Sequence, residues 1–112
     1  MPPRAHFRAF ARRLVALDGA VSADEGWSQD VRVIDLGLGG ARLSLVQAIP
    51  RGTALELAIT APQLWDALVI HAEVVWVAIQ DDAHARIGVK FKHSSGAILR
   101  ALTELLDTTA YR

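Results

Sequence analysis

Four arginines near the start of the chain are the residues best placed to contact a ligand. All of them precede the first acidic residue, Asp18, and they are Arg4, Arg8, Arg12 and Arg13. The chain as a whole is balanced, with 12 basic and 12 acidic residues and a net charge of zero, so it has no polyanion-binding signature. A neutral chain with a cationic start suits a small anion better than a long nucleic acid. The alternative is a solvated, frayed terminus, which is common at chain ends.

Residues that could catalyse a reaction or hold a metal are present, but their spacing is unproductive. The histidines form no HExxH or i, i+4 pair and are His6, His71, His84 and His93. No serine lies in a G-x-S-x-G sequence, and there is no Walker loop and no cysteine. The glycines of residues 37–40 precede a strand and not a helix, unlike a phosphate-binding fingerprint. We therefore expect a binding module without catalytic residues, metal or cofactor.

The elements that would position these residues follow from hydrophobic periodicity. Alternating apolar and polar residues predict short strands at residues 14–17, 31–36, 41–45, 55–59, 67–79 and 87–91. Asp18-Gly19 is expected to end the first strand. In the fifth strand, one face is expected to carry Ile70, Ala72, Val74 and Trp76. The chain's three tryptophans are expected to pack in the core or at the barrel ends: Trp27, Trp65 and Trp76.

The period changes after residue 93, where the sequence predicts a helix over residues 94–109. Ser94 or Ser95 can cap it. Apolar residues lie at helical spacing at Ile98, Leu102, Leu105 and Leu106, with Leu99 beside them, and a stripe pressed onto the core is expected at Leu99, Leu102 and Leu106. Six strands and one terminal helix favour a domain dominated by β-structure, a six-stranded antiparallel β-barrel with a C-terminal α-helix. A β-sandwich with an added helix is the alternative.

Two motifs in this frame resemble the signature of the PilZ family. The first is R-x-x-x-R from Arg4 to Arg8, and the second is D-L-G-L-G-G at residues 35–40, similar to the family's [D/N]-x-S-x-x-G. The strands at 72–77 and 88–91 and the leucine-rich helix follow in the family's usual order. The resemblance covers most of the chain and implies one PilZ domain over residues 1–112, with a flexible N-terminal arm over residues 1–9.

The resemblance also implies a ligand, the bacterial second messenger cyclic di-GMP, which has two phosphates and two guanines. Arg4 and Arg8 would fork hydrogen bonds onto a phosphate or a guanine edge and stack on a purine. Asp35 would accept hydrogen bonds from the guanine N1–H and 2-amino group, and Gly40 would permit a tight turn. Alternatively, the arginines are solvated tail charges and Asp35 binds backbone amides at a turn.

The chain departs from the family pattern at Gly37, where the family has serine. A lost hydrogen bond of about 0.5–1.5 kcal/mol would weaken binding by about tenfold or less. A positive φ at Gly37 would in addition oppose a serine there. A second R-x-x-x-R, from Arg8 to Arg12, leaves Arg12 as an alternative to Arg4 in the arginine pair.

The sequence thus predicts a stand-alone cytoplasmic PilZ receptor that binds cyclic di-GMP and relays the signal to an unidentified protein partner. We expect no nucleic-acid binding. We expect no membrane insertion either, because no apolar run approaches the roughly 18 residues needed to span a bilayer. The basic start lacks the apolar segment of a secretory signal. The alternative function is a degenerate PilZ adaptor, for example in motility or envelope machinery, that does not bind the nucleotide.

Overall fold

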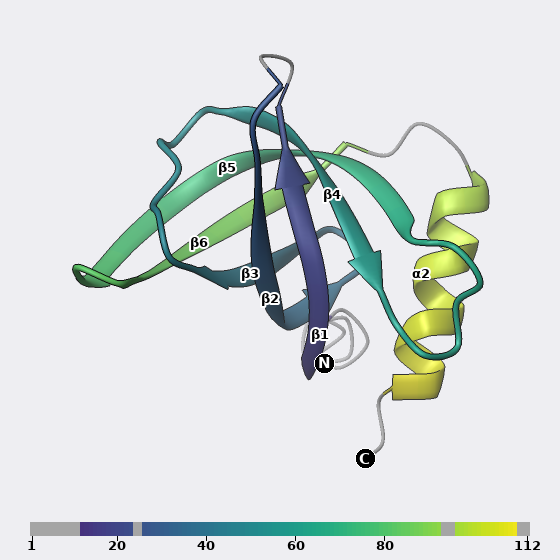
Figure 1. Ribbon diagram of the computed structural model, residues 1–112. Helices are drawn as coiled ribbons and strands as arrows, with labels where there is room; N and C mark the ends of the chain where they lie inside the picture. The colour runs from purple at the N-terminus through teal and green to yellow at the C-terminus, as the bar shows by residue number, and fades with distance from the viewer. Residues whose placement is uncertain (1–11, 24–25, 93–95, 110–112) are drawn as a thin grey trace, which may run out of the picture.

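The computed structural model describes residues 12–23, 26–92 and 96–109, and within these residues six antiparallel strands form a closed barrel followed by a helix (Figure 1). The elements are β1 (Arg12–Ser22), β2 (Ser28–Gly37), β3 (Gly40–Leu45), β4 (Ala54–Thr60), β5 (Leu68–Asp81), β6 (His84–Phe91) and α2 (Gly96–Thr109). The strand order is β1-β2-β3-β6-β5-β4, and pairing of β1 with β4 closes the barrel. The predicted fold class is confirmed as a barrel and not a sandwich.

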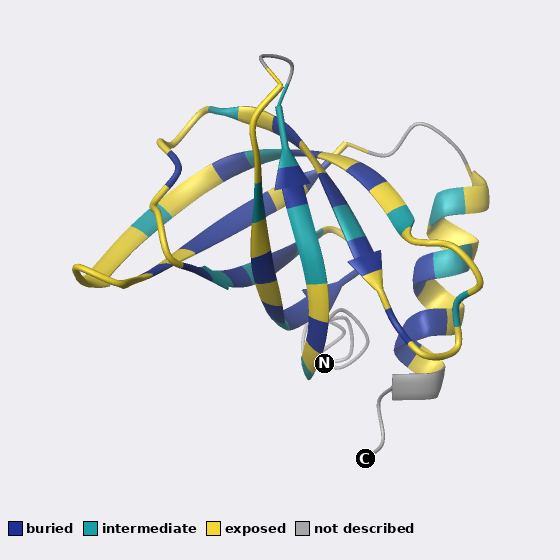
Figure 2. Ribbon diagram, viewed as in Figure 1, coloured by how far each residue is buried: buried dark blue, intermediate teal, exposed yellow. Residues whose placement is uncertain are grey.

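The barrel core consists of the apolar side chains on the inner face of each strand (Figure 2). In β3, for example, Ala41, Leu43 and Leu45 are buried, whereas Arg42 and Ser44 lie half-buried on the outer face. Complete burial of one such side chain contributes about 1.5–3 kcal/mol relative to exposure. The largest fully buried side chains are Leu36, Leu43, Leu57, Ile59, Ile70, Ile87, Leu102, Leu105, Val21, Val33 and Val74.

The helix α2 packs against β2 and β5 and extends the barrel core. Its core-facing residues are Ile98, Leu102, Leu105 and Leu106. The predicted stripe is therefore only partly right, because Leu99 is 38% exposed and the contact face is centred on Ile98, Leu102 and Leu105. The proposed caps, Ser94 and Ser95, lie outside the described residues.

The prediction that Asp18-Gly19 ends the first strand is wrong. β1 continues to Ser22, and Gly19 lies opposite Ile59 in the seam between β1 and β4. A Cβ at Gly19 would lie 2.9 Å from the carbonyl oxygen of Ala58. The glycine therefore permits the close approach of two strands and not a turn.

A bulge in β5 reverses the side-chain alternation. The register of β5 against β6 shifts between Val74 and Trp76, which leaves Val75 as the extra residue. Trp76 therefore lies on the outer face, 38% exposed, while Val77 packs against the core. The prediction that Trp76 lies on the same face of the strand as Val74 is wrong. Gly88 makes room for the indole, because a Cβ there would overlap the Trp76 ring.

The connection between β4 and β5 exposes a second tryptophan. Its backbone is folded back by a hydrogen bond from the Leu64 N–H to the Ala61 carbonyl at 3.0 Å. Ala61 is buried and Leu64 is half-buried against the core, so these two side chains anchor the connection. Trp65 is left 100% exposed, and the prediction that it packs in the core or at a barrel end is wrong.

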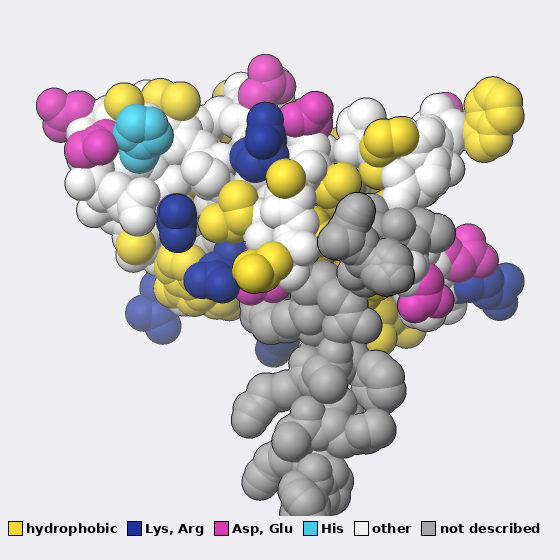
Figure 3. All heavy atoms as spheres, turned by 90° about the horizontal axis from the view of Figure 1, so that it is seen from below, with side chains coloured by type: hydrophobic (Ala, Val, Ile, Leu, Met, Phe, Trp, Pro, Cys, Tyr) yellow, Lys and Arg dark blue, Asp and Glu magenta, His cyan; other side chains and the backbone are white. Residues whose placement is uncertain are grey.

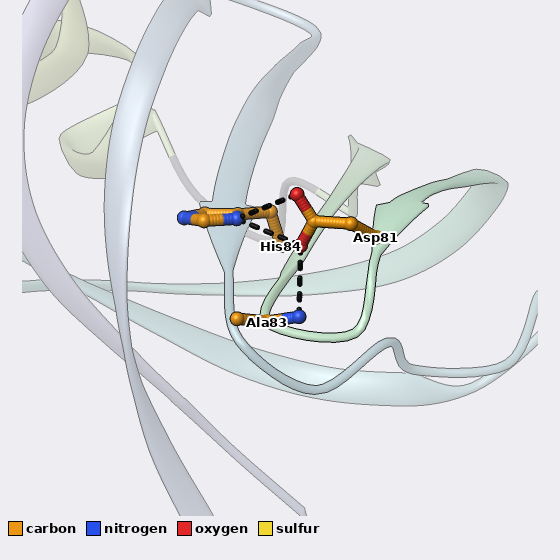
Figure 4. A network of polar contacts seen from close by, with 3 residues as sticks. All are labelled: Asp81, Ala83 and His84. Carbon is orange, nitrogen blue, oxygen red and sulfur yellow. Dashed lines mark hydrogen bonds and ion pairs between the residues drawn. The ribbon is translucent and has the colours of Figure 1, made fainter.

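The turn between β5 and β6 is held by the carboxylate of Asp81 (Figure 4). The Ala83 N–H donates to Asp81 Oδ1 at 2.8 Å, and His84 Nδ1 lies 2.8 Å from the same oxygen. The Ala83 amide, followed by the His84 side chain, lowers the pKa of Asp81 below its ordinary value. The tip of the hairpin therefore keeps a negative charge at neutral pH.

Candidate functional site

The second motif forms the connection between β2 and β3. Gly37 is the last residue of β2 and Gly40 is the first residue of β3. A Cβ on Gly40 would overlap the carbonyl oxygen of Val89, so glycine is required for β3 to approach β6 at this point. The Phe91 N–H donates to the Gly39 carbonyl at 2.9 Å. These contacts attach the motif to β6 and fix its position on the barrel.

An ion pair joins the motif to the next strand. Nη2 and Nε of Arg42 donate to Oδ2 of Asp35 at 2.8 and 3.1 Å. The two residues are directly opposite each other across β2 and β3. The side chain of Asp35 is 6% exposed and that of Arg42 is 39% exposed. Arg42 therefore compensates a buried carboxylate and also presents its guanidinium at the surface.

Asp35 and Arg42 belong to a row of residues that crosses five strands. The row runs from Leu14 in β1 through Asp35, Arg42 and Gly88 to Trp76 in β5, each directly opposite the next. Directly opposed residues of antiparallel strands project from the same face. At a strand spacing of 4.7–4.9 Å, this outer-face row extends over about 19 Å. It combines an 80% exposed leucine, an ion pair and a half-exposed indole.

The described part of the surface is of mixed character at this end of the barrel. Seen from below, Lys and Arg side chains lie among hydrophobic ones (Figure 3). A surface of cations and apolar groups can contact both the phosphates and the bases of a nucleotide.

The predicted site residues are only partly among those that the structure describes. Asp35, Gly37 and Gly40 lie together at the connection between β2 and β3, as expected from their closeness in sequence. Arg4 and Arg8 lie outside the described residues. The competing candidate, Arg12, has its backbone opposite Gly37.

Sequence reasoning missed Arg42. In the sequence it was one polar residue of an alternating strand, with no feature that pointed to Asp35. The signal that could have found it is its place two residues after Gly40, because a short connection between antiparallel strands fixes which residues are opposed.

The backbone at Gly37 differs from expectation. Among the described glycines, φ is positive at Gly26 and Gly52, so the positive φ considered for Gly37 is not found. The backbone at Gly37 is therefore compatible with a side chain as far as φ is concerned. Glycine in place of serine therefore removes a hydroxyl group from the site, and it is not required there by a left-handed backbone.

Polar residues also line a cavity elsewhere on the described part of the barrel. This cavity of about 330 Å³ is lined in part by Glu56, His71 and Lys92. Its polar side chains have exposed partners: His71 lies 3.7 Å from Glu56, and Lys92 lies 3.3 Å from Glu73. No group of three metal-ligating side chains occurs in the described part of the chain. The described part of the chain contains no helix that is long and apolar enough to cross a membrane.

Comparisons with solved structures identify the architecture. The chain is similar to the PilZ domain of YcgR from Escherichia coli with c-di-GMP, at 17% identity and a TM-score of 0.72, over 88% of this chain and 87% of that chain. It is similar to the Bacillus subtilis inhibitor of motility MotI/DgrA, at 18% identity and a TM-score of 0.71, over 96% of this chain and 55% of that one. A K. pneumonia MrkH–c-di-GMP complex matches at 16% identity and a TM-score of 0.70, over 85% of this chain and 48% of that one.

The chain thus spans only about half the length of MotI/DgrA and MrkH. A comparison with curated protein sequences gives no match. The family model described as "PilZ domain" matches residues 3–108. This match extends from the arginines near the start to the last turn of α2. The chain belongs to the PilZ domain family.

Proposed function

We propose that this chain is a receptor for cyclic di-GMP that relays ligand binding to a protein partner. The observation that carries the proposal is the Asp35–Arg42 ion pair, at the connection between β2 and β3 of a PilZ domain. Structures of YcgR and MrkH, two proteins with this fold, contain c-di-GMP. In this proposal the whole chain is one domain, and residues 1–9 are an arm that closes over the ligand.

Each group has a defined task. Arg4 and Arg8 bind a phosphate or a guanine edge through paired N–H donors. Asp35 accepts from the guanine N1–H and 2-amino group, and Arg42 holds this carboxylate in position. Gly40 keeps the site against β6. A receptor for a second messenger must meet it in the cytoplasm, and the proposal includes that location.

The relay to a protein requires a surface that a partner can recognise. Trp65 is fully exposed on the connection between β4 and β5, and tryptophan is enriched among the residues that dominate interface energetics. Its anchored backbone presents the indole with little loss of conformational entropy on binding. This side chain is the first candidate for the partner contact.

The alternative is an adaptor that does not bind the nucleotide. One observation favours it: Gly37 stands where the family has serine, so the hydroxyl is missing. Calorimetric titration with cyclic di-GMP distinguishes the two functions. The receptor gives heat that saturates with added ligand, whereas the adaptor gives none.

Calorimetric titration of the chain with cyclic di-GMP is expected to give saturable binding in the micromolar range. Arg8→Ala is expected to lose about 1.5–3 kcal/mol of binding free energy, because it removes a charge-assisted contact. Its melting temperature should stay close to that of the parent. Absence of binding by the parent would establish the adaptor function instead. Binding lost in Arg12→Ala but kept in Arg4→Ala would show that the arginine pair is Arg8 with Arg12.

Gly37→Ser is expected to tighten cyclic di-GMP binding by up to about tenfold, the worth of one ordinary hydrogen bond. The φ at Gly37 is not in the left-handed region, so no backbone strain opposes the change. Thermal unfolding of the free protein is the control and should be unchanged. A variant as stable as the parent that gains no affinity would contradict a ligand site at this turn.

A further inference from the structure

The strand β5 is longer than the strand that flanks it on one side. It pairs with β4 from Leu68 to Glu73, and Val74 then exchanges hydrogen bonds with Gly52 and Thr53 at 2.8 and 3.0 Å. From Val75 onward it pairs with β6 alone. In the described ranges no strand lies along the other side of residues 75–80, which we call the open edge. In Figure 1 this part of the β5–β6 hairpin extends to the left, away from α2.

The open edge is apolar and exposed. Ile79 is 73% exposed, Val75 and Trp76 are each 38% exposed, and Ala78 and Gln80 are also exposed (Figure 2). Sheet edges in soluble proteins are usually protected by lysine, proline or a covering segment, because unpaired N–H and C=O groups attract another strand. Residues 75–80 contain neither a charge nor a proline.

The shape of the open edge also permits pairing. The bulge at Val75 bends the strand where its contact with β4 ends. Beyond the bulge, each residue from Trp76 to Ile79 is directly opposite one residue of β6. A second register shift follows between Ile79 and Asp81, so the regular stretch that is available for one more strand is Trp76 to Ile79.

We propose that the open edge binds the open edge of a second copy of this chain, as two antiparallel strands related by a two-fold axis. Two identical uncharged segments can lie side by side without opposing like charges. The net charge of zero removes long-range repulsion between copies near neutral pH. Because the remaining strands belong to a closed barrel, one contact of this kind gives a dimer and not a filament.

The charges at the two ends of the open edge are complementary in this arrangement. Arg51 is exposed and adjoins Gly52, which binds Val74 at the start of the open edge. Asp81 and Asp82 lie at the other end, at the tip of the hairpin. An antiparallel pair brings the acidic tip of each copy toward Arg51 of the other. This order of charges favours a second copy antiparallel to the first.

Sedimentation equilibrium of the chain is expected to show a concentration-dependent dimer with twice the 12.1 kDa mass of the monomer. Ile79→Lys should lower the association constant by about tenfold or more, because each copy then contributes a positive charge to the joined edge and the two charges repel. The side chain is mostly exposed, so the fold should tolerate the change. Leu99→Lys is the matched control, since it replaces an exposed apolar residue on α2, away from the open edge (Figure 1), and it should dimerise like the parent.

Disulfide trapping tests the geometry directly, because the chain has no cysteine of its own. Single variants Val77→Cys, Ala78→Cys and Ile79→Cys sample the centre of the open edge, where residues of the two copies would face each other at about 4.5–5.5 Å between Cα atoms. At least one should form a disulfide dimer on mild oxidation, whereas Thr103→Cys on α2 should not. A parent that stays monomeric at its highest soluble concentration overturns the proposal, as does a dimer lost in Leu99→Lys and kept in Ile79→Lys.

Discussion

Gly40→Ala is expected to lower the free energy of unfolding by about 3 kcal/mol, at the upper end of the usual cost of overpacking. The added methyl group would overlap the backbone carbonyl of Val89, which cannot rotate away as a side chain could. Relief requires β3 and β6 to separate, and this would disturb the hydrogen bond from Phe91 to Gly39. Urea unfolding followed by circular dichroism measures the loss.

Gly39→Ala is the matched control for this prediction. No heavy atom lies within 4 Å of a Cβ at Gly39, and its φ is not positive. The change in free energy of unfolding should therefore stay within about 0.5 kcal/mol. Equal losses at the two neighbouring glycines would show that flexibility of the connection, and not the contact with β6, requires glycine at position 40.

Arg42→Ala is expected to lower the free energy of unfolding by about 2–3 kcal/mol, because it removes two charge-assisted hydrogen bonds from the buried carboxylate of Asp35. The cost arises mainly because the buried carboxylate of Asp35 would no longer have the positive charge of Arg42 beside it. Under the proposed function, binding of cyclic di-GMP should weaken as well. Unfolding at neutral pH, together with calorimetry, gives both quantities.

An exposed ion pair of the same type provides the comparison. Arg32 Nε lies 3.4 Å from Asp18 Oδ1, with side chains 56% and 81% exposed. Arg32→Ala should cost less than about 1 kcal/mol, because both charges remain hydrated. If Arg42→Ala is as mild as Arg32→Ala, then Asp35 does not depend on Arg42 and the ion pair has no special part in the site.

The strands could be predicted because each one buries a single face, so that Leu43 and Leu45 alternate with Ser44 in the sequence as they do in the barrel. The bulge could not, because residues 74–77 are all apolar and give no alternation that an extra residue could interrupt. Gly19 was misjudged for a different reason. Asp-Gly is a local turn signal, and the close approach of β1 to β4 that overrides it joins residues far apart in the sequence.

The candidate site could likewise be predicted only in part from the sequence. Asp35, Gly37 and Gly40 are close neighbours in sequence, so a motif alone brings them together. The partner of Asp35 depends on strand register, which is fixed only once β2 and β3 pair. The row that continues to Trp76 depends in turn on the bulge. Trp65 is exposed, whereas Ala61 and Leu64 in the same connection lie against the core.

The two seams of the barrel also determine how the chain reaches its native state. The β1–β4 seam joins Asp18 with Thr60, and the β3–β6 seam joins Gly40 with Lys90. Each requires the closure of a loop of several tens of residues before its contacts can form, and this entropy must be offset in the transition state. Domains built from such distant pairings fold in milliseconds to seconds, slower than helical bundles. We therefore expect the close contacts at Gly19 and Gly40 to form late in folding, and the connection between β2 and β3 to be completed only when the barrel closes.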